Sequence, residues 1–136
     1  MKVKYEDTPY LQVRFQYGGE QFDLDCVVDS GASDCVFPVD LADVLGIDLS
    51  CAPDKEYGAV GGGKLIGKLH TIDMQVAGLD DKWTTVLAGF LENEDTPILG
   101  RSGFFENYEV TFRHFDQNME IISKKKRRPK PPRSKV

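Results

Sequence analysis

The sequence lacks any long hydrophobic run, and it has few of the residues that build metal centres or disulfide frameworks. Its apolar runs are only a few residues long, so we expect no transmembrane helix. The 136 residues include three cysteines and two histidines, and the cysteine spacings match no zinc motif. No secretory signal and no Asn-x-Ser/Thr site is visible. These absences favour a cytoplasmic protein with buried, reduced thiols at Cys26, Cys35 and Cys51, and with no metal or organic cofactor.

The composition fits one folded domain with a charged extension. Hydrophobic residues make up 40% of the chain, enough for a packed core, and the net charge is −5. Residues 124–136 hold eight Lys or Arg, three Pro and no acid, whereas residues 1–123 hold nine basic and 22 acidic residues. We therefore predict a folded domain over 1–123 and a solvated tail over 124–136. The charge of the tail suits contact with anions or nucleic acid.

Alternating apolar and polar residues predict mostly β structure. Alternation on both sides of Gly18-Gly19 predicts a hairpin over 10–28. Pro38 and Gly46 bracket a short helix with Leu41, Val44 and Leu45 on one face. The other expected strands are 57–60, 69–76, 83–88, 98–99, 110–112 and 119–122, with a loop over 48–56 and a short amphipathic turn over 101–105. The predicted fold class is mainly β, a small closed barrel or sandwich with one or two short helices.

The segment with the clearest chemical meaning is Val27-Val28-Asp29-Ser30-Gly31-Ala32, in which a buried strand runs directly into a carboxylate. A charge at the end of a buried strand is costly unless something uses or satisfies it. Ser30 can hydrogen-bond nearby backbone, and Gly31 allows a close turn with its N–H near the carboxylate. Taken alone, Asp-Ser-Gly also fits an Asx-turn that closes a hairpin.

Two further motifs give this segment a context. Ala59-Val60-Gly61-Gly62-Gly63 follows it, and Ile98-Leu99-Gly100-Arg101 lies near the end of the domain. With these three motifs in this order, residues 10–122 resemble the retropepsin-like (retroviral-type) aspartic proteases, in particular their small prokaryotic members. The resemblance implies a closed acid-protease barrel and a bacterial cytosolic enzyme, with a retroelement polyprotein segment as the second possibility.

The resemblance also assigns roles to the motif residues. It implies that Asp29 is catalytic and that Ser30, Gly31 and Ala32 support its loop. It implies that Val60, Gly61, Gly62 and Gly63 form a flap over an extended peptide substrate. It gives Leu99, Gly100 and Arg101 a structural role behind the active-site loop.

The chain contains a single Asp-Ser-Gly, although aspartic protease chemistry needs two carboxylates that share a proton. A symmetric homodimer supplies both, with Asp29 of each copy meeting on the two-fold axis. The predicted function is therefore aspartic endopeptidase, a hydrolase that acts on an extended peptide or protein. The alternative is a retropepsin-like dimerisation or peptide-binding module with weak catalysis.

One position departs from the family pattern. Many retroviral enzymes place a carboxylate directly after Asp-Ser/Thr-Gly-Ala, where it pairs with the Arg of the later motif. Here Ser33 occupies that position and Asp34 follows it, so the pair to look for is Arg101–Asp34. Other chemistries fit less well: Asp23 and Asp25 are expected to face solvent, and the Gly61–Lys64 segment lacks the Ser/Thr and helix of a P-loop.

Overall fold

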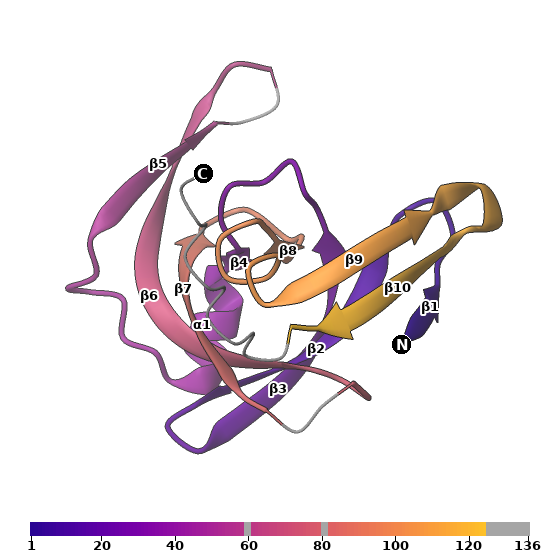
Figure 1. Ribbon diagram of the computed structural model, residues 1–136. Helices are drawn as coiled ribbons and strands as arrows, with labels where there is room; N and C mark the ends of the chain where they lie inside the picture. Colours follow the sequence, from indigo (N-terminus) through magenta and orange to yellow (C-terminus); the bar gives the residue numbers. More distant parts are fainter. Residues whose placement is uncertain (59–60, 80–81, 125–136) are drawn as a thin grey trace, which may run out of the picture.

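The structure is a computed structural model, and it describes residues 1–58, 61–79 and 82–124 (Figure 1). Val60 and residues 125–136 of the predicted tail lie outside the described residues. The elements in chain order are β1 (Lys2–Lys4), β2 (Tyr10–Tyr17), β3 (Glu20–Val28), β4 (Val36–Pro38), α1 (Val39–Leu45), β5 (Asp54–Gly58), β6 (Lys64–Val76), β7 (Thr84–Leu91), β8 (Ile98–Leu99), β9 (Tyr108–Arg113), a 3₁₀ turn (His114–Asp116) and β10 (Asn118–Ser123).

The larger of the two sheets closes on itself. Its strand order is β2-β3-β8-β4-β7-β6-β5, and a further antiparallel pairing of β2 with β6 joins the two sides into a barrel. The predicted hairpin over 10–28 is confirmed as β2 and β3, with Tyr10 opposite Val27 and Tyr17 opposite Glu20. This closure leaves β5 as an extra strand on the outer part of β6 (Figure 1).

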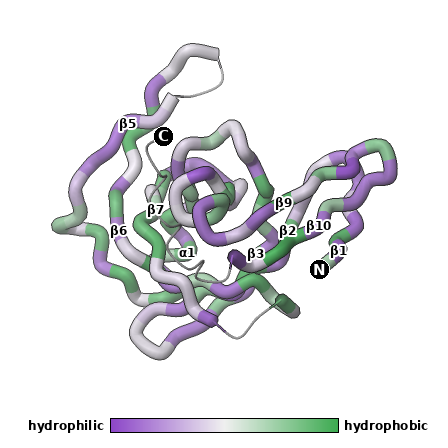
Figure 2. Tube along the Cα trace, viewed as in Figure 1, coloured by the Kyte–Doolittle hydropathy of each residue, from purple (hydrophilic) through white to green (hydrophobic). Residues whose placement is uncertain are grey.

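The barrel encloses a core of aromatic and aliphatic side chains. Phe15, Phe37 and Phe90 are fully buried, with ring centroids 4.8 Å apart for the first pair and 6.0 Å for the second. Phe15 points inward between two polar neighbours, as in a half-buried strand. Phe37 and Phe90 lie in largely buried apolar stretches of β4 and β7. Figure 2 shows that β7 is largely hydrophobic and that β5 is largely hydrophilic, in agreement with the mostly buried residues of β7 and the mostly exposed residues of β5.

A short crossing of strands positions the loop that carries the Asp-Ser-Gly motif. β8 lies between β3 and β4, parallel to β3 (Val28 opposite Leu99) and antiparallel to β4 (Val36 opposite Ile98). The chain from β3 to β4, residues 29–35, therefore passes the end of β8. We call this segment loop 29–35.

The predicted helix is confirmed as α1, which packs against β3, β4 and β7. Pro38 precedes it with φ −64°, and Gly46 ends it in the left-handed region at φ 75°, where only glycine is unstrained. Leu41 and Leu45 are buried, whereas Val44 is 51% exposed, so its assignment to the same face was wrong. The buried face of this seven-residue helix consists of Leu41, Ala42 and Leu45, and it is narrower than the apolar residues of the sequence predicted.

The second sheet has the order β1-β10-β9 and is formed by both ends of the described chain. Lys2 lies opposite Glu120, and Met119 lies opposite Phe112. Buried residues of this sheet, among them Met119 and Ile121, belong to the same core cluster as the barrel residues. The two sheets therefore share one core.

The predicted loop over 48–56 and the predicted burial of Cys51 were wrong. Strand β5 begins at Asp54, inside the predicted loop over 48–56. The amphipathic turn predicted over 101–105 is confirmed, as part of successive turns over residues 101–107. Cys51 is exposed, while Cys26 and Cys35 are buried as free thiols, as expected. No helix in the described ranges is long and apolar enough to cross a membrane.

Candidate active site

Asp29 stands where β3 ends, and its backbone is tied to β8. The Asp29 N–H donates to the Leu99 carbonyl at 3.0 Å, and the Val27 N–H donates to the Pro97 carbonyl at 2.9 Å. These bonds continue the parallel pairing of β3 with β8 up to the motif itself. The first and third sequence motifs thus meet in space, as the resemblance implied.

The Asp29 side chain is half-buried and has one fixed oxygen. Its Oδ1 accepts the Gly31 N–H at 2.9 Å, and the Ala32 N–H donates to the Asp29 carbonyl at 3.2 Å. A Cβ at position 31 would lie 3.1 Å from Oδ1, so glycine gives the carboxylate its room. Within the described part of the chain, Oδ2 has no hydrogen-bond partner. One oxygen is therefore oriented by the backbone and the other is free for chemistry.

Residues 100–102 hold loop 29–35 from behind. The Arg101 N–H donates to the Ala32 carbonyl at 2.9 Å, and the Ser102 N–H donates to the Ser33 carbonyl at 2.8 Å. A Cβ on Gly100 would overlap the Asp34 carbonyl and would lie 2.9 Å from the Ala32 oxygen. The close approach of the two segments therefore requires glycine at this position.

Cys35 lies beneath this junction and was missed as a site residue. Its Sγ accepts the Gly100 N–H at 3.4 Å and lies 3.4 Å from the Ser102 carbonyl. Burial raises the pKa of the Cys35 thiol to about 11, which keeps it protonated and unreactive near neutral pH. Its role here is to fill space under the loop.

The Arg101–Asp34 pair is not formed. The Arg101 guanidinium instead donates from Nη1 to the Ser30 carbonyl at 2.9 Å. Asp34 accepts from Lys55 Nζ and, at 3.0 Å, from the Tyr57 hydroxyl, both through Oδ2. The Asp34 side chain is only 14% exposed. The carboxylate shifted by one position thus contacts β5, on the opposite side of the cavity, and not the arginine.

Tyr57 fits a slot made by two glycines that sequence reasoning passed over. A Cβ on Gly67 or on Gly89 would lie 2.9 Å from the Tyr57 ring carbon Cε2. Burial, followed by the hydrogen bond to Asp34, raises the pKa of the Tyr57 hydroxyl, so it remains a donor. Glycines inside strands β6 and β7 were the available signal, because such glycines often mark a close approach.

The β5–β6 hairpin carries the glycine-rich motif at its turn. Gly61 and Gly62 adopt φ values of 94° and 88°, which other residues rarely reach. Figure 1 shows this hairpin projecting beyond the barrel. Gly61, Gly62 and Gly63 do not line the cavity beside Asp29, whereas Tyr57, Gly58 and Leu65 of the same hairpin do.

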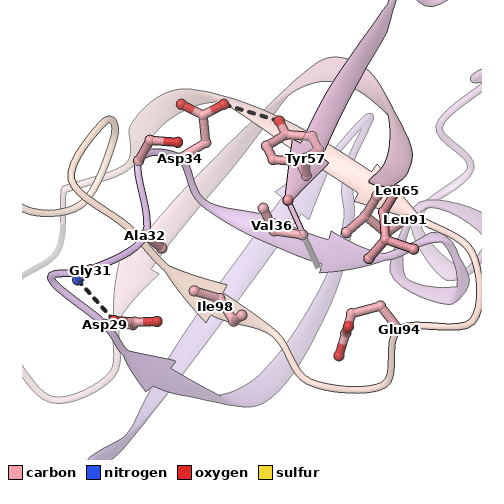
Figure 3. Close-up of a pocket in the computed structure, with 12 residues that line it drawn as sticks. Asp29, Gly31, Ala32, Asp34, Val36, Tyr57, Leu65, Leu91, Glu94 and Ile98 are labelled. Atoms are coloured by element: carbon pink, nitrogen blue, oxygen red, sulfur yellow. Dashed lines mark hydrogen bonds between the residues drawn. The ribbon is translucent and has the colours of Figure 1, made fainter. Parts of the chain in front are cut away.

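A cavity of about 630 Å³ lies between loop 29–35 and this hairpin (Figure 3). Of the predicted site residues, Asp29, Gly31 and Ala32 line it, while Ser30, Leu99, Gly100 and Arg101 lie outside its lining. Its walls combine apolar side chains with three carboxylates. The full lining is Asp29, Gly31, Ala32, Ser33, Asp34, Val36, Tyr57, Gly58, Leu65, Leu91, Glu94 and Ile98.

Metal ligation has no support in this site. In the residues for which side chains are described, no three His, Cys, Asp or Glu side chains gather in a way that could hold an ion. Asp23, one of the acids considered, pairs with Arg14 at 3.0 Å on the exposed face of the β2–β3 hairpin.

Comparison with known proteins gives a structural match and no sequence match. No family model matches the chain, and no curated protein does. Among solved structures, the chain is similar to a retropepsin-like aspartic protease from Rickettsia conorii, with a TM-score of 0.61 and 18% sequence identity. The match covers 90% of this chain and 97% of that one. The predicted fold class, mainly β and retropepsin-like, is thereby confirmed.

Proposed function

We propose that this protein is an aspartic endopeptidase whose catalytic group is Asp29, paired with Asp29 of a second copy. The observation that carries the proposal is the hydrogen bonding of the Asp29 carboxylate and its position at a cavity. One oxygen is fixed by the Gly31 N–H at 2.9 Å, the other has no partner in the described residues, and Asp29 lines a cavity. The retropepsin-like fold around it supports the same chemistry. The proposed catalytic domain is 1–123, with 124–136 as an appended tail.

The second carboxylate has to come from another chain. Asp34 is the nearest candidate in the same loop, but Lys55 and Tyr57 already occupy its Oδ2. Two carboxylates brought together cannot both ionise, so they share one proton and titrate as a pair. A two-fold axis through the Asp29 loops brings two identical carboxylates together and needs no further residue.

The reaction then follows from the shared proton. The ionised Asp29 of one copy removes a proton from a bound water as that water attacks the scissile carbonyl carbon. The protonated Asp29 of the other copy donates its proton to the carbonyl oxygen, and a tetrahedral diol forms. Collapse of the diol breaks the C–N bond. The first carboxyl gives its proton to the leaving nitrogen, and the second, now ionised, takes a proton from a diol hydroxyl, which forms the C=O of the product acid and restores one proton to the pair. Activity therefore needs one proton on the pair, which favours an acidic to near-neutral optimum.

The walls of the cavity suit an extended peptide. The β5–β6 hairpin offers backbone for strand-like pairing with a substrate, and its glycine turn leaves it free to close. Val36, Leu65 and Ile98 supply apolar contact beside Asp29. Such a site selects peptides by backbone pairing and by alternate side-chain pockets.

The test is cleavage of a mixed peptide library by the wild type, Asp29→Asn and Asp25→Asn. Asp25 is the matched control, because it is an exposed aspartate on β3 that does not line the cavity. We expect Asp29→Asn to lower cleavage by roughly a thousandfold or more, and Asp25→Asn to retain it. A statine-type transition-state analogue should inhibit the wild type, and specific activity should fall on dilution as dimers dissociate.

Equal cleavage by wild type and Asp29→Asn would refute the proposal. Absence of cleavage in samples shown to be folded dimers would also refute it, and would favour the peptide-binding module. Circular dichroism and sedimentation of each variant separate these results from a failure to fold or to dimerise.

A further inference from the structure

The cavity beside Asp29 carries an imbalance of charge. Three carboxylates line it, from Asp29, Asp34 and Glu94, and none of the lining residues is Lys or Arg. Asp34 is neutralised by Lys55, whose Nζ contacts Oδ2, and it also accepts the Tyr57 hydroxyl. In the proposed function, Asp29 is engaged in the shared proton of the catalytic pair. Glu94 is the remaining carboxylate, and the reaction gives it no role.

Glu94 is held in place by its own loop. It lies in the segment that joins β7 to β8, and its Oε1 accepts the Thr96 N–H at 3.3 Å. The side chain is half-buried, and no cation pairs with it in the described ranges. A partly buried carboxylate without a counter-charge is unfavourable, so a ligand that brings a positive charge gains from meeting it.

Apolar side chains surround this carboxylate within the cavity. Leu65 and Leu91 lie to one side of Glu94, and Ile98 lies between Glu94 and Asp29 (Figure 3). Leu91 is buried, while Leu65 and Ile98 are half-buried and therefore available for contact. The surroundings of Glu94 thus combine an aliphatic wall with one negative charge beside the Asp29 carboxylate.

We propose that Glu94 makes this site selective for peptides with Lys or Arg close to the scissile bond. A Lys or Arg side chain has an aliphatic stem and a cationic head, which match the aliphatic wall and the carboxylate respectively. A purely apolar side chain fills the same space but desolvates Glu94 without a partner. The inference rests on the proposed function, since it names the substrate class of that same site.

The test compares cleavage of one peptide scaffold in which a single position at a time carries Lys, Arg, norleucine or Glu. Norleucine preserves the lysine stem and lacks the charge. The enzymes are the wild type, Glu94→Gln, Glu94→Lys and Glu92→Gln. Glu92 is the matched control, because it is an exposed glutamate two residues earlier in the same loop and does not line this cavity.

We expect the wild type and Glu92→Gln to prefer Lys over norleucine in kcat/KM at one position near the cut, by roughly tenfold. Glu94→Gln should abolish that preference, and Glu94→Lys should shift it towards Glu. Raised salt should reduce the preference of the wild type, because the contact is partly exposed to solvent. Cleavage of the norleucine peptide should rise from the wild type to Glu94→Gln, because an amide costs less to desolvate than a carboxylate.

A preference for Lys that persists in Glu94→Gln overturns the inference, and so does Asp29-dependent cleavage with no charge preference at any position. Both results leave the proposed protease function intact. Should cleavage itself be absent, binding of fluorescent Lys and norleucine peptides to the wild type and Glu94→Gln decides the matter. Tighter binding of the Lys peptide that depends on Glu94 supports the selectivity, and equal binding overturns it.

Discussion

Replacing Gly89 with alanine would place a methyl group against the Tyr57 ring, so its effect on stability should depend on Tyr57. The added Cβ would lie 2.7 Å from Tyr57 Cζ and 2.9 Å from Cε2, whereas carbon atoms pack best at about 3.5–4.0 Å. The Gly89 backbone cannot retreat, because it pairs with Leu69 on one side and Val36 on the other. The ring must therefore leave its slot and give up its hydrogen bond to Asp34.

The magnitude follows from overpacking, which typically costs about 1–3 kcal/mol. We expect Gly89→Ala to lower the free energy of unfolding by about 2 kcal/mol in the wild type. In a Tyr57→Ala background the slot is empty, and the same substitution should be neutral or should stabilise by about 0.4–1 kcal/mol, because alanine restricts the unfolded chain. Gly67→Ala is the comparison, since its Cβ also meets Leu91 Cδ2 at 3.1 Å and Tyr57→Ala should rescue it only in part.

Urea unfolding of the four proteins in the Gly89–Tyr57 cycle measures the coupling. One fixed protein concentration is used, because the stability of the proposed dimer depends on concentration. A coupling of about 2–3 kcal/mol is expected, which is the difference between the cost in the wild type and the neutral or stabilising effect in Tyr57→Ala. If Gly89→Ala lowers the free energy of unfolding equally with and without Tyr57, the methyl group disturbs the strands themselves. That result would refute the explanation that the Tyr57 ring occupies the space beside Gly89.

The remaining predictions concern the same region. Gly100→Ala should cost about 3 kcal/mol or more in urea unfolding, because its Cβ would overlap the backbone of loop 29–35, whereas Gly58→Ala, with nothing within 4 Å of its Cβ, should cost much less. Equal losses of stability in Gly100→Ala and Gly58→Ala would contradict the inference that Gly100 is required by its close contact with loop 29–35. The folded state raises the pKa of Tyr57, so it binds more protons than the unfolded chain above about pH 10, and stability should fall as pH rises there. Tyr57→Phe should show a smaller alkaline loss by the same assay, and an unchanged loss would contradict that assignment.

The parts of the fold that were predictable depend on local patterns. The β2–β3 hairpin follows from alternation on both sides of a Gly-Gly turn, and α1 follows from Pro38 and Gly46 at its two ends. The errors lie where tertiary pairing outweighs the local pattern. β5 begins at Asp54 in a polar stretch because it pairs with β6, with Asp54 opposite Lys68.

In the candidate site too, some residues were predictable from local sequence motifs and others depend on tertiary structure. The Asp-Ser-Gly motif and the later Gly-Arg motif identify the segments that meet, because each is a local signature. Tyr57 and Glu94, which line the cavity, and Lys55, which contacts Asp34, carry no such signature. They lie at this site only because the barrel brings β5 and the β7–β8 segment to loop 29–35. Their contacts follow only from the three-dimensional structure, although Gly67 and Gly89 within strands indicated that a bulky side chain packs against them.

The displaced carboxylate of loop 29–35 shows how one position in the sequence redirects a contact. Asp34 forms a parallel bridge with Ser102, and in paired backbone a shift of one residue turns a side chain to the opposite side. The acid at 34 therefore points across the cavity to Lys55 and Tyr57, and the Arg101 guanidinium binds the Ser30 carbonyl instead. The loop keeps an arginine contact, and the β5–β6 hairpin gains an anchor beside Asp29. Lys55 thereby neutralises Asp34, so the proposed selectivity for Lys or Arg depends on Glu94, a lining carboxylate without such a partner in the described residues.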